Sequence, residues 1–147
     1  MLVILIFIFY SIAANGEFRF LGYGKNYDLN RKYSMSIKNH NETNDCTVKA
    51  LAFGLNKSYD EAHLQMKELG RVNRKSIVFK NIANNIKEIR EIEGYNDVRL
   101  WTFLKENKNG IFLILTYGHI FVVKDGKVYD GGIKRGSRKI IKVYEVE

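Results

Sequence analysis

The chain has 147 residues, of which 46% are hydrophobic and 27% are charged, proportions that indicate a folded globular protein rather than a disordered one. It contains no proline and a single cysteine, which excludes proline-rich linkers, an intramolecular disulfide and a zinc site built on a cysteine pair. The net charge of +8 is spread along the chain, and its densest basic clusters, residues 71–75 and 134–139, lack interleaved aromatic residues for base stacking, so we do not expect a nucleic-acid partner.

The chain opens with an unbroken apolar run at residues 2–10. A bilayer is spanned by about 20 apolar residues, so the run is too short for a membrane-spanning helix, although it suits the apolar part of a secretory signal. No basic residue precedes it, and a buried first strand of a cytoplasmic protein is the alternative. We expect residues 1–14 to be an export signal or membrane-associated segment and residues 15–147 to form one domain. The alternating residues 17–23 predict a short strand.

The first predicted helix covers residues 45–53 and ends near Gly54. Thr43 or Asn44 is expected to be its N-cap, because both side chains can accept a hydrogen bond from a free N–H group of the first turn. Apart from Lys49, the helix has almost no polar face. This composition predicts a helix that is surrounded by protein.

A second helix is predicted to begin at Ser58, where Ser58 and Glu61 form a capping box, and to end before Gly70. Four apolar residues share one face of this helix at the appropriate spacing: Tyr59, Ala62, Met66 and Leu69. His63 lies away from that face, so we expect it to be exposed to solvent.

Two further helices are predicted before the character of the sequence changes. Four isoleucines at helical spacing indicate a third helix that stops at Gly94: Ile82, Ile86, Ile89 and Ile92. A fourth, short helix is predicted at residues 97–106, with three side chains turned inward: Val98, Trp101 and Leu104.

The C-terminal third reads as strands. The continuous apolar run at 110–116 is typical of a strand buried on both faces, and a second apolar segment follows at 119–123. Asp125-Gly126 suits a two-residue hairpin turn, after which the chain returns at 128–130. The last ten residues, 138–147, predict another strand. Helices followed by antiparallel strands predict an α+β fold, with a helical half packed on a C-terminal sheet.

Cys46 and His119 are the pair on which a catalytic function depends. A free cysteine is usually a small core residue, but a thiol at a helix N-terminus is easily ionised. His119 follows Gly118 at the start of a core strand, where its imidazole could hold a thiolate as an ion pair. A hairpin turn at Asp125-Gly126 would place His119 opposite position 132, close to Asp130, so Asp130 is expected to orient the imidazole.

Three segments of the chain carry a resemblance to a known family: NDCTVKALA, YDEAH and FLKENKNGIFLILTYGHIFVVKDGKVYD. They resemble the small papain-like cysteine peptidases of bacteria and phages, and are similar in layout to the double-glycine leader peptidases. The likeness covers about residues 41–132, and its specific parts are Asp45-Cys46 and Gly118-His119. It implies a papain-like fold, peptide or protein substrates, no cofactor and no metal. It also implies Cys46 as nucleophile, His119 as general base and Asp130 as the third member of a triad.

The chain departs from this family at the oxyanion site. These peptidases usually carry Gln about six residues before the cysteine, and here that position is His40. Asn41 and Asn44 are the amide side chains that could replace Gln, together with the backbone N–H of Cys46. His40 is a weaker candidate.

Three functions therefore stay open at the level of sequence. The first is a thiol hydrolase of peptide or amide bonds, within which peptidase, deamidase and acyltransferase activities are not separated. The second is a papain-like protein that has lost its chemistry and binds another protein, which the absence of Gln favours. The third, binding of nucleic acid through the basic clusters, would show affinity that falls steeply with salt.

Overall fold

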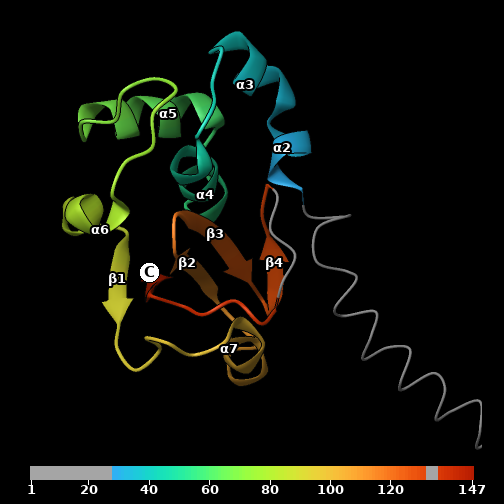
Figure 1. The fold of residues 1–147 in the computed structure, drawn as a ribbon. Coiled ribbons are helices and arrows are strands. Elements are labelled where there is room, and N and C mark those ends of the chain that lie inside the picture. The colour runs from blue at the N-terminus through green and yellow to red at the C-terminus, as the bar shows by residue number, and fades with distance from the viewer. Residues whose placement is uncertain (1–27, 132–135) are drawn as a thin grey trace, which may run out of the picture.

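The computed structural model describes residues 28–131 and 136–147 of the chain (Figure 1). The predicted segment 1–14 and the predicted strand at 17–23 lie outside the described residues. The helices are α2 (Leu29–Lys32), α3 (Ser34–Asn39), α4 (Cys46–Gly54), α5 (Tyr59–Glu68), α6 (Phe79–Ile82), the 3₁₀ turn η1 (Ala83–Asn85) and α7 (Leu100–Glu106). The strands are β1 (Ile89–Ile92), β2 (Ile111–Thr116), β3 (His119–Lys124), β4 (Lys127–Tyr129) and β5 (Lys142–Val146). The α+β layout, with most helices first and the sheet largely C-terminal, is confirmed.

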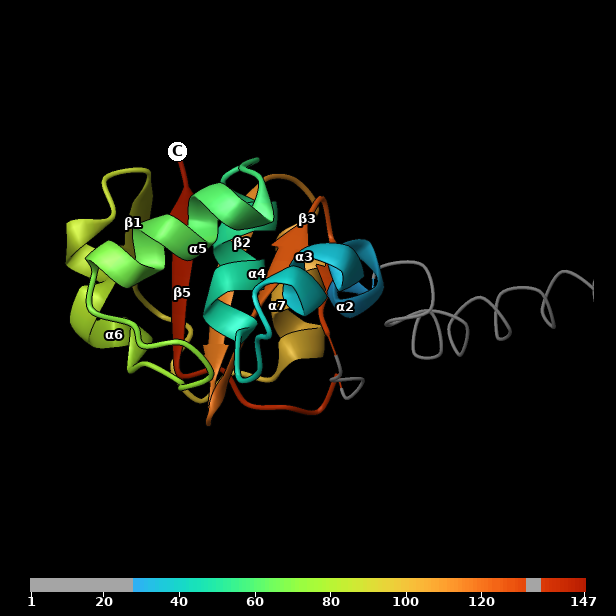
Figure 2. The same cartoon turned by 90° about the horizontal axis from the view of Figure 1, so that it is seen from above.

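The five strands form one antiparallel sheet in the order β1-β5-β2-β3-β4. Figures 1 and 2 show α4 and α5 on one side of this sheet and α7 on the other. Successive residues of β2 face the two sides in turn, with Leu113 in the core beside α4 and Phe112 and Ile114 in the core beside α7. Burial on both faces explains the continuous apolar run that predicted β2, and that prediction is confirmed.

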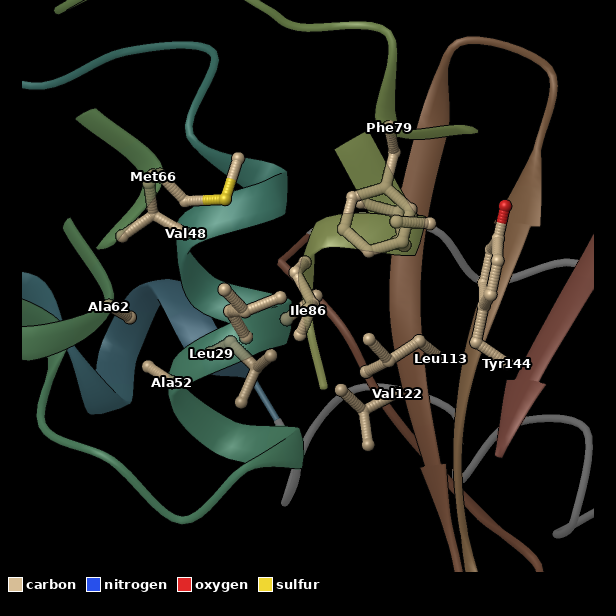
Figure 3. Close-up of a cluster of buried hydrophobic side chains, with 14 of the residues drawn as sticks. Leu29, Val48, Ala52, Ala62, Met66, Phe79, Ile86, Leu113, Val122 and Tyr144 are labelled. Atoms are coloured by element: carbon tan, nitrogen blue, oxygen red, sulfur yellow. The ribbon is translucent and has the colours of Figure 1, made fainter. Parts of the chain in front are cut away.

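The helix that carries the single cysteine lies between the sheet and α5 (Figures 1 and 2). In Figure 3, Leu113 and Val122 extend from the sheet toward this helix, and Val48 and Ala52 belong to the same cluster of buried side chains. The predicted burial of α4 is therefore confirmed. Gly54 at its end allows a close approach, since a Cβ there would lie 2.6 Å from Cδ2 of Leu113.

The start of α4 corrects one prediction. Asp45 is its N-cap, in place of Thr43 or Asn44, and α4 begins at Cys46. Asn44 instead takes a φ of +51°, a conformation that asparagine tolerates in turns, and so cannot have the extended backbone usual at an N-cap.

Helix α5 agrees with its prediction. The side chain of Ser58 accepts a hydrogen bond from the N–H of Glu61, and the Glu61 carboxylate accepts one from the N–H of Ser58. Gly70 follows the helix with a φ of +103°.

The predicted third helix is wrong beyond Ile82. Helix α6 and η1 end by residue 85, and residues 89–92 form the edge strand β1, paired with β5 from Ile89–Val146 to Ile92–Val143. The spacing of the four isoleucines fits a helix, but their β-branched side chains also suit a strand, and pairing with the distant C-terminus decides between the two.

Helix α7 begins three residues later than predicted. Asp97 has a φ of +67° and Arg99 is the extended N-cap, so the helix starts at Leu100. The later start changes the inward face, which consists of Leu100, Phe103 and Leu104. Of the three side chains predicted to point inward, Leu104 is therefore confirmed as buried, while Val98 and Trp101 are half-buried.

The β3–β4 hairpin is formed as predicted. Asp125 and Gly126 have φ values of +50° and +76°, which a two-residue type I′ turn requires. Val122 pairs with Tyr129, and Lys124 pairs with Lys127. This register fixes where the chain leaves β4, and so fixes the position of Asp130.

Of the helices in the described part of the chain, none has the length and apolar character needed to cross a membrane.

Candidate active site

Cys46 is the first residue of α4, where backbone N–H groups have no partner within the helix. The side chain of the N-cap residue often accepts hydrogen bonds from these N–H groups. The side chain of Asp45 makes no such bond. Its carboxylate instead accepts hydrogen bonds from Tyr59 Oη at 2.7 Å and pairs with Lys49 Nζ at 3.0 Å. The positive end of α4 is therefore left for the thiol of Cys46.

His119 is the first residue of β3 and follows the turn at Gly118, whose φ of +67° reverses the chain after β2. The imidazole of His119 and the thiol of Cys46 form a hydrogen bond. The backbone N–H of Ile120 also donates to the sulfur of Cys46. Residues 73 positions apart in the sequence thus meet where the N-terminus of α4 contacts the start of β3.

The carboxylate of Asp130 contacts the imidazole of His119 at its Nε2 atom. Its Oδ1 is 2.6 Å from Nε2 of His119, and Asp130 is only 4% exposed. Extending the register of the hairpin by one pair places Asp130 opposite Phe121, two residues from His119 and on the same face of the sheet. The structure therefore joins Cys46, His119 and Asp130 in one chain of hydrogen bonds.

The electrostatics of this group favour a thiolate beside an imidazolium. Burial alone would raise the pKa of Cys46, but the hydrogen bond and charge of His119, with smaller effects from Ile120 and Lys49, hold that pKa below its ordinary value. Burial alone would lower the pKa of His119, but its bonds to Asp130 and Cys46 raise that pKa to about 9. Each shift stabilises the charged form of its group, as a nucleophilic thiol requires.

The chain matches no protein-family model, no curated protein and no solved structure. Within residues 28–131 and 136–147, no group of three or more His, Cys, Asp or Glu side chains is arranged to hold a metal ion. The geometry around Cys46 is therefore the observation that bears on function.

The two asparagines predicted at the oxyanion site both contact Arg74. Asn44 donates its Nδ2 to the carbonyl oxygen of Arg74 at 3.1 Å. Asn41 accepts a hydrogen bond on Oδ1 from Arg74 Nη1 at 2.9 Å, which leaves its Nδ2 to donate elsewhere. Both residues have positive φ, so they also shape the loop that leads to Cys46.

His63 was predicted to be exposed, and this is wrong. It is 8% exposed, and its Nε2 lies 3.0 Å from Oε2 of Glu42. The same carboxylate accepts hydrogen bonds from Arg71 and from the N–H of Arg74. Because Glu42 lies 21 residues before His63 in the sequence, the pattern of α5 alone cannot reveal this partner. His40 lies beside this group, stacked on His63 with ring centroids 4.1 Å apart.

Sequence reasoning also missed Asn30, whose Oδ1 accepts a hydrogen bond from Lys49. A signal for such a partner existed, because Lys49 is the one charged residue within α4, whose burial was predicted, and a buried ammonium group needs a polar partner. Nothing in the sequence identifies which residue supplies it.

Proposed function

We propose that the protein is a thiol hydrolase of papain-like design that acts on peptide or amide bonds. The observation that carries this proposal is the hydrogen-bonded chain from Cys46 through His119 to Asp130. The arrangement of a nucleophile at the head of a buried helix, packed on an antiparallel sheet that supplies the histidine, supports the papain-like assignment.

The proposed reaction has two steps. In the first, Sγ of Cys46 attacks the carbonyl carbon and a C–S bond forms, while the proton on His119 passes to the leaving nitrogen as the C–N bond breaks. In the second, His119 takes a proton from a water molecule, which attacks the thioester, and the C–S bond breaks to release the acid and regenerate the thiolate. Since Nε2 of His119 faces Asp130, Nδ1 is the atom that exchanges protons at the thiol.

The negative oxygen of each intermediate needs donors. The backbone N–H of Cys46 is one, because it has no partner within α4. Asn41 is the better choice for the second, since Arg74 occupies its Oδ1 and not its Nδ2, whereas Asn44 already uses Nδ2.

Products from a peptide library, identified by mass spectrometry, would test the proposal. A peptidase gives two new termini with the gain of one water, and a deamidase converts a side-chain amide to an acid without breaking the chain. We expect one of these changes with the wild type and neither with Cys46→Ala or His119→Ala. Equal products from wild type and Cys46→Ala, or none from the wild type, would contradict it.

A specific observation also favours a second function, binding of a protein without catalysis. Both asparagines near the thiol are engaged with Arg74 and have turn conformations, so they have a structural use that does not involve an oxyanion. Under this alternative, Cys46→Ala would keep the full biological effect of the protein, whereas a hydrolase would lose it.

A further inference from the structure

We infer that Asn30 and Lys49 are positioning residues that hold Asp130 in line with His119 and Cys46. This inference rests on the hydrolase function proposed above. The group they position follows β4, a three-residue strand at the edge of the sheet that pairs with β3. A short edge strand needs further contacts to hold a side chain in one place.

Those contacts come from α2. The backbone N–H of Leu29 donates to the carbonyl oxygen of Asp130 at 3.0 Å. The next residue, Asn30, donates its Nδ2 to the carbonyl oxygen of Gly131. Two consecutive residues of α2 therefore bind two consecutive carbonyl groups at the end of β4, one of which belongs to Asp130.

Lys49 joins α2 to the helix that carries the nucleophile. Its Nζ donates to Oδ1 of Asn30 at 2.5 Å and pairs with Oδ1 of Asp45 at 3.0 Å. Asp45 is adjacent to Cys46 and is itself held by Tyr59. A continuous series of polar contacts thus runs from the residue before the nucleophile to the residue after the triad carboxylate.

The chemistry of each member suits this task. An amide has one donor end and one acceptor end, so Asn30 can accept from an ammonium group and donate to a carbonyl at the same time. Lys49 is only 8% exposed, and a charge so deeply buried is stable only with its partners in place. Gly131 leaves little room for a side chain, because a Cβ there would lie 2.7 Å from Oδ1 of Asn30 and 2.9 Å from Nζ of Lys49, so the ends of both side chains would have to shift.

This series of polar contacts also borders a cavity. Asn30, Asp45 and Lys49 line a cavity of about 530 Å³ between the helices α2 and α3 and the start of α4. Asn41, the proposed oxyanion donor, lines the same cavity. A substrate that enters this cavity would contact Asn30 and Lys49 together with the loop before Cys46.

The rate of alkylation of Cys46 by iodoacetamide, measured from about pH 5 to pH 9, tests the inference without knowledge of the substrate. We expect Asn30→Leu, Lys49→Met and Gly131→Ala each to slow the reaction near pH 6 by about tenfold, the effect of losing a charge-assisted hydrogen bond. Lys49→Arg keeps a cation and N–H donors on a larger, differently shaped group, so it should slow the reaction less than Lys49→Met does.

Two controls separate positioning from simple loss of stability. Asn73→Leu makes the same change on the exposed loop between α5 and α6 and should have no effect. Asp130→Asn combined with Asn30→Leu should slow alkylation less than the product of the two single effects, because both act through Asp130. A merely structural Asn30 would lower the urea midpoint and leave the pH profile unchanged, which would overturn the inference.

The outcome for His119→Ala keeps the two proposals apart. If that variant slows alkylation but Asn30→Leu and Gly131→Ala do not, the positioning role is wrong and the hydrolase proposal stands. If His119→Ala has no effect, the hydrolase proposal itself fails.

Discussion

Nε2 of His119 lies 2.6 Å from Oδ1 of Asp130, eleven residues further along the chain. The two side chains come from neighbouring strands of one hairpin, and the turn at Asp125-Gly126 sets their register. The side chain of Asp130 is 3% exposed and that of His119 is 19% exposed, so the pair is largely shielded from water. A local turn sequence thus determines a contact on which the proposed chemistry depends.

The stability of the protein should depend on pH through this contact. The folded pKa of His119, about 9, lies above its ordinary value of 6.5. Its contribution to stability is therefore complete below about pH 6.5 and is lost as the pH rises through 9. Urea unfolding of proteins with and without Asp130→Asn should show a difference in stability that narrows across this range.

Both proteins in that comparison should carry Cys46→Ala, so that the thiol does not titrate. Without the thiolate, the folded pKa of His119 is raised less, so the contribution of His119 to stability is lost below pH 9. A difference in stability that is constant from pH 6 to pH 9 would show that His119 and Asp130 are not coupled.

Gly54→Ala should destabilise the fold by about 1–3 kcal/mol, the usual cost of adding a group to a packed core. The new methyl group would meet Cδ2 of Leu113 at 2.6 Å, so the buried Leu113 side chain or the backbones of α4 and β2 must shift. Gly70→Ala is the matched control: a Cβ there meets nothing within 4 Å, and only the strain at its φ of +103° applies. Chemical denaturation measures both, and a smaller effect at Gly54 than at Gly70 would contradict the packing described here.

Glu42→Gln should destabilise the loop before Cys46. The Glu42 side chain is fully buried and receives hydrogen bonds from Arg71 and from the N–H of Arg74. Removing its charge leaves the Arg71 guanidinium buried without its counter-charge, which typically costs about 3–5 kcal/mol. Thermal unfolding at neutral pH measures the loss, and Glu68→Gln, on the exposed end of α5, is the control.

The carboxylate of Glu42 should also make the stability of the fold depend on pH in the acid range. Although burial alone would raise the pKa of Glu42, the hydrogen bonds and charge of Arg71 and the N–H of Arg74 hold it below its ordinary value of 4.5. Its contribution is therefore present above about pH 4.5 and is lost as the pH falls through the lower folded pKa. Glu42→Gln should lose this part of the acid dependence, and an unchanged acid profile would contradict it.

Local chemistry explains what the sequence predicted well. The capping box at Ser58 and the Asp125-Gly126 turn each depend on a few adjacent residues, and both are formed as expected. The register of this hairpin also made it possible to predict that Asp130 lies near His119. The position of Cys46 at the start of a buried helix was predicted from the polar residues before it and the apolar run after it.

Long-range partners explain what the sequence did not predict. Residues 89–92 have a pattern that also fits a helix, and their pairing with β5 makes them a strand. The burial of His63 depends on Glu42, and the environment of Lys49 depends on Asn30. Each of these partners lies 19 or more residues away, where periodicity carries no information.

The rate of alkylation of Cys46 by iodoacetamide as a function of pH tests most directly whether the thiol and the imidazole share a proton. The wild type should react at a pH below the ordinary pKa of a thiol, and His119→Ala should shift the profile to higher pH, because the hydrogen bond and charge of the imidazole no longer favour the thiolate. Identical profiles for the two proteins, both at the position of a free thiol, would contradict the proposed active site.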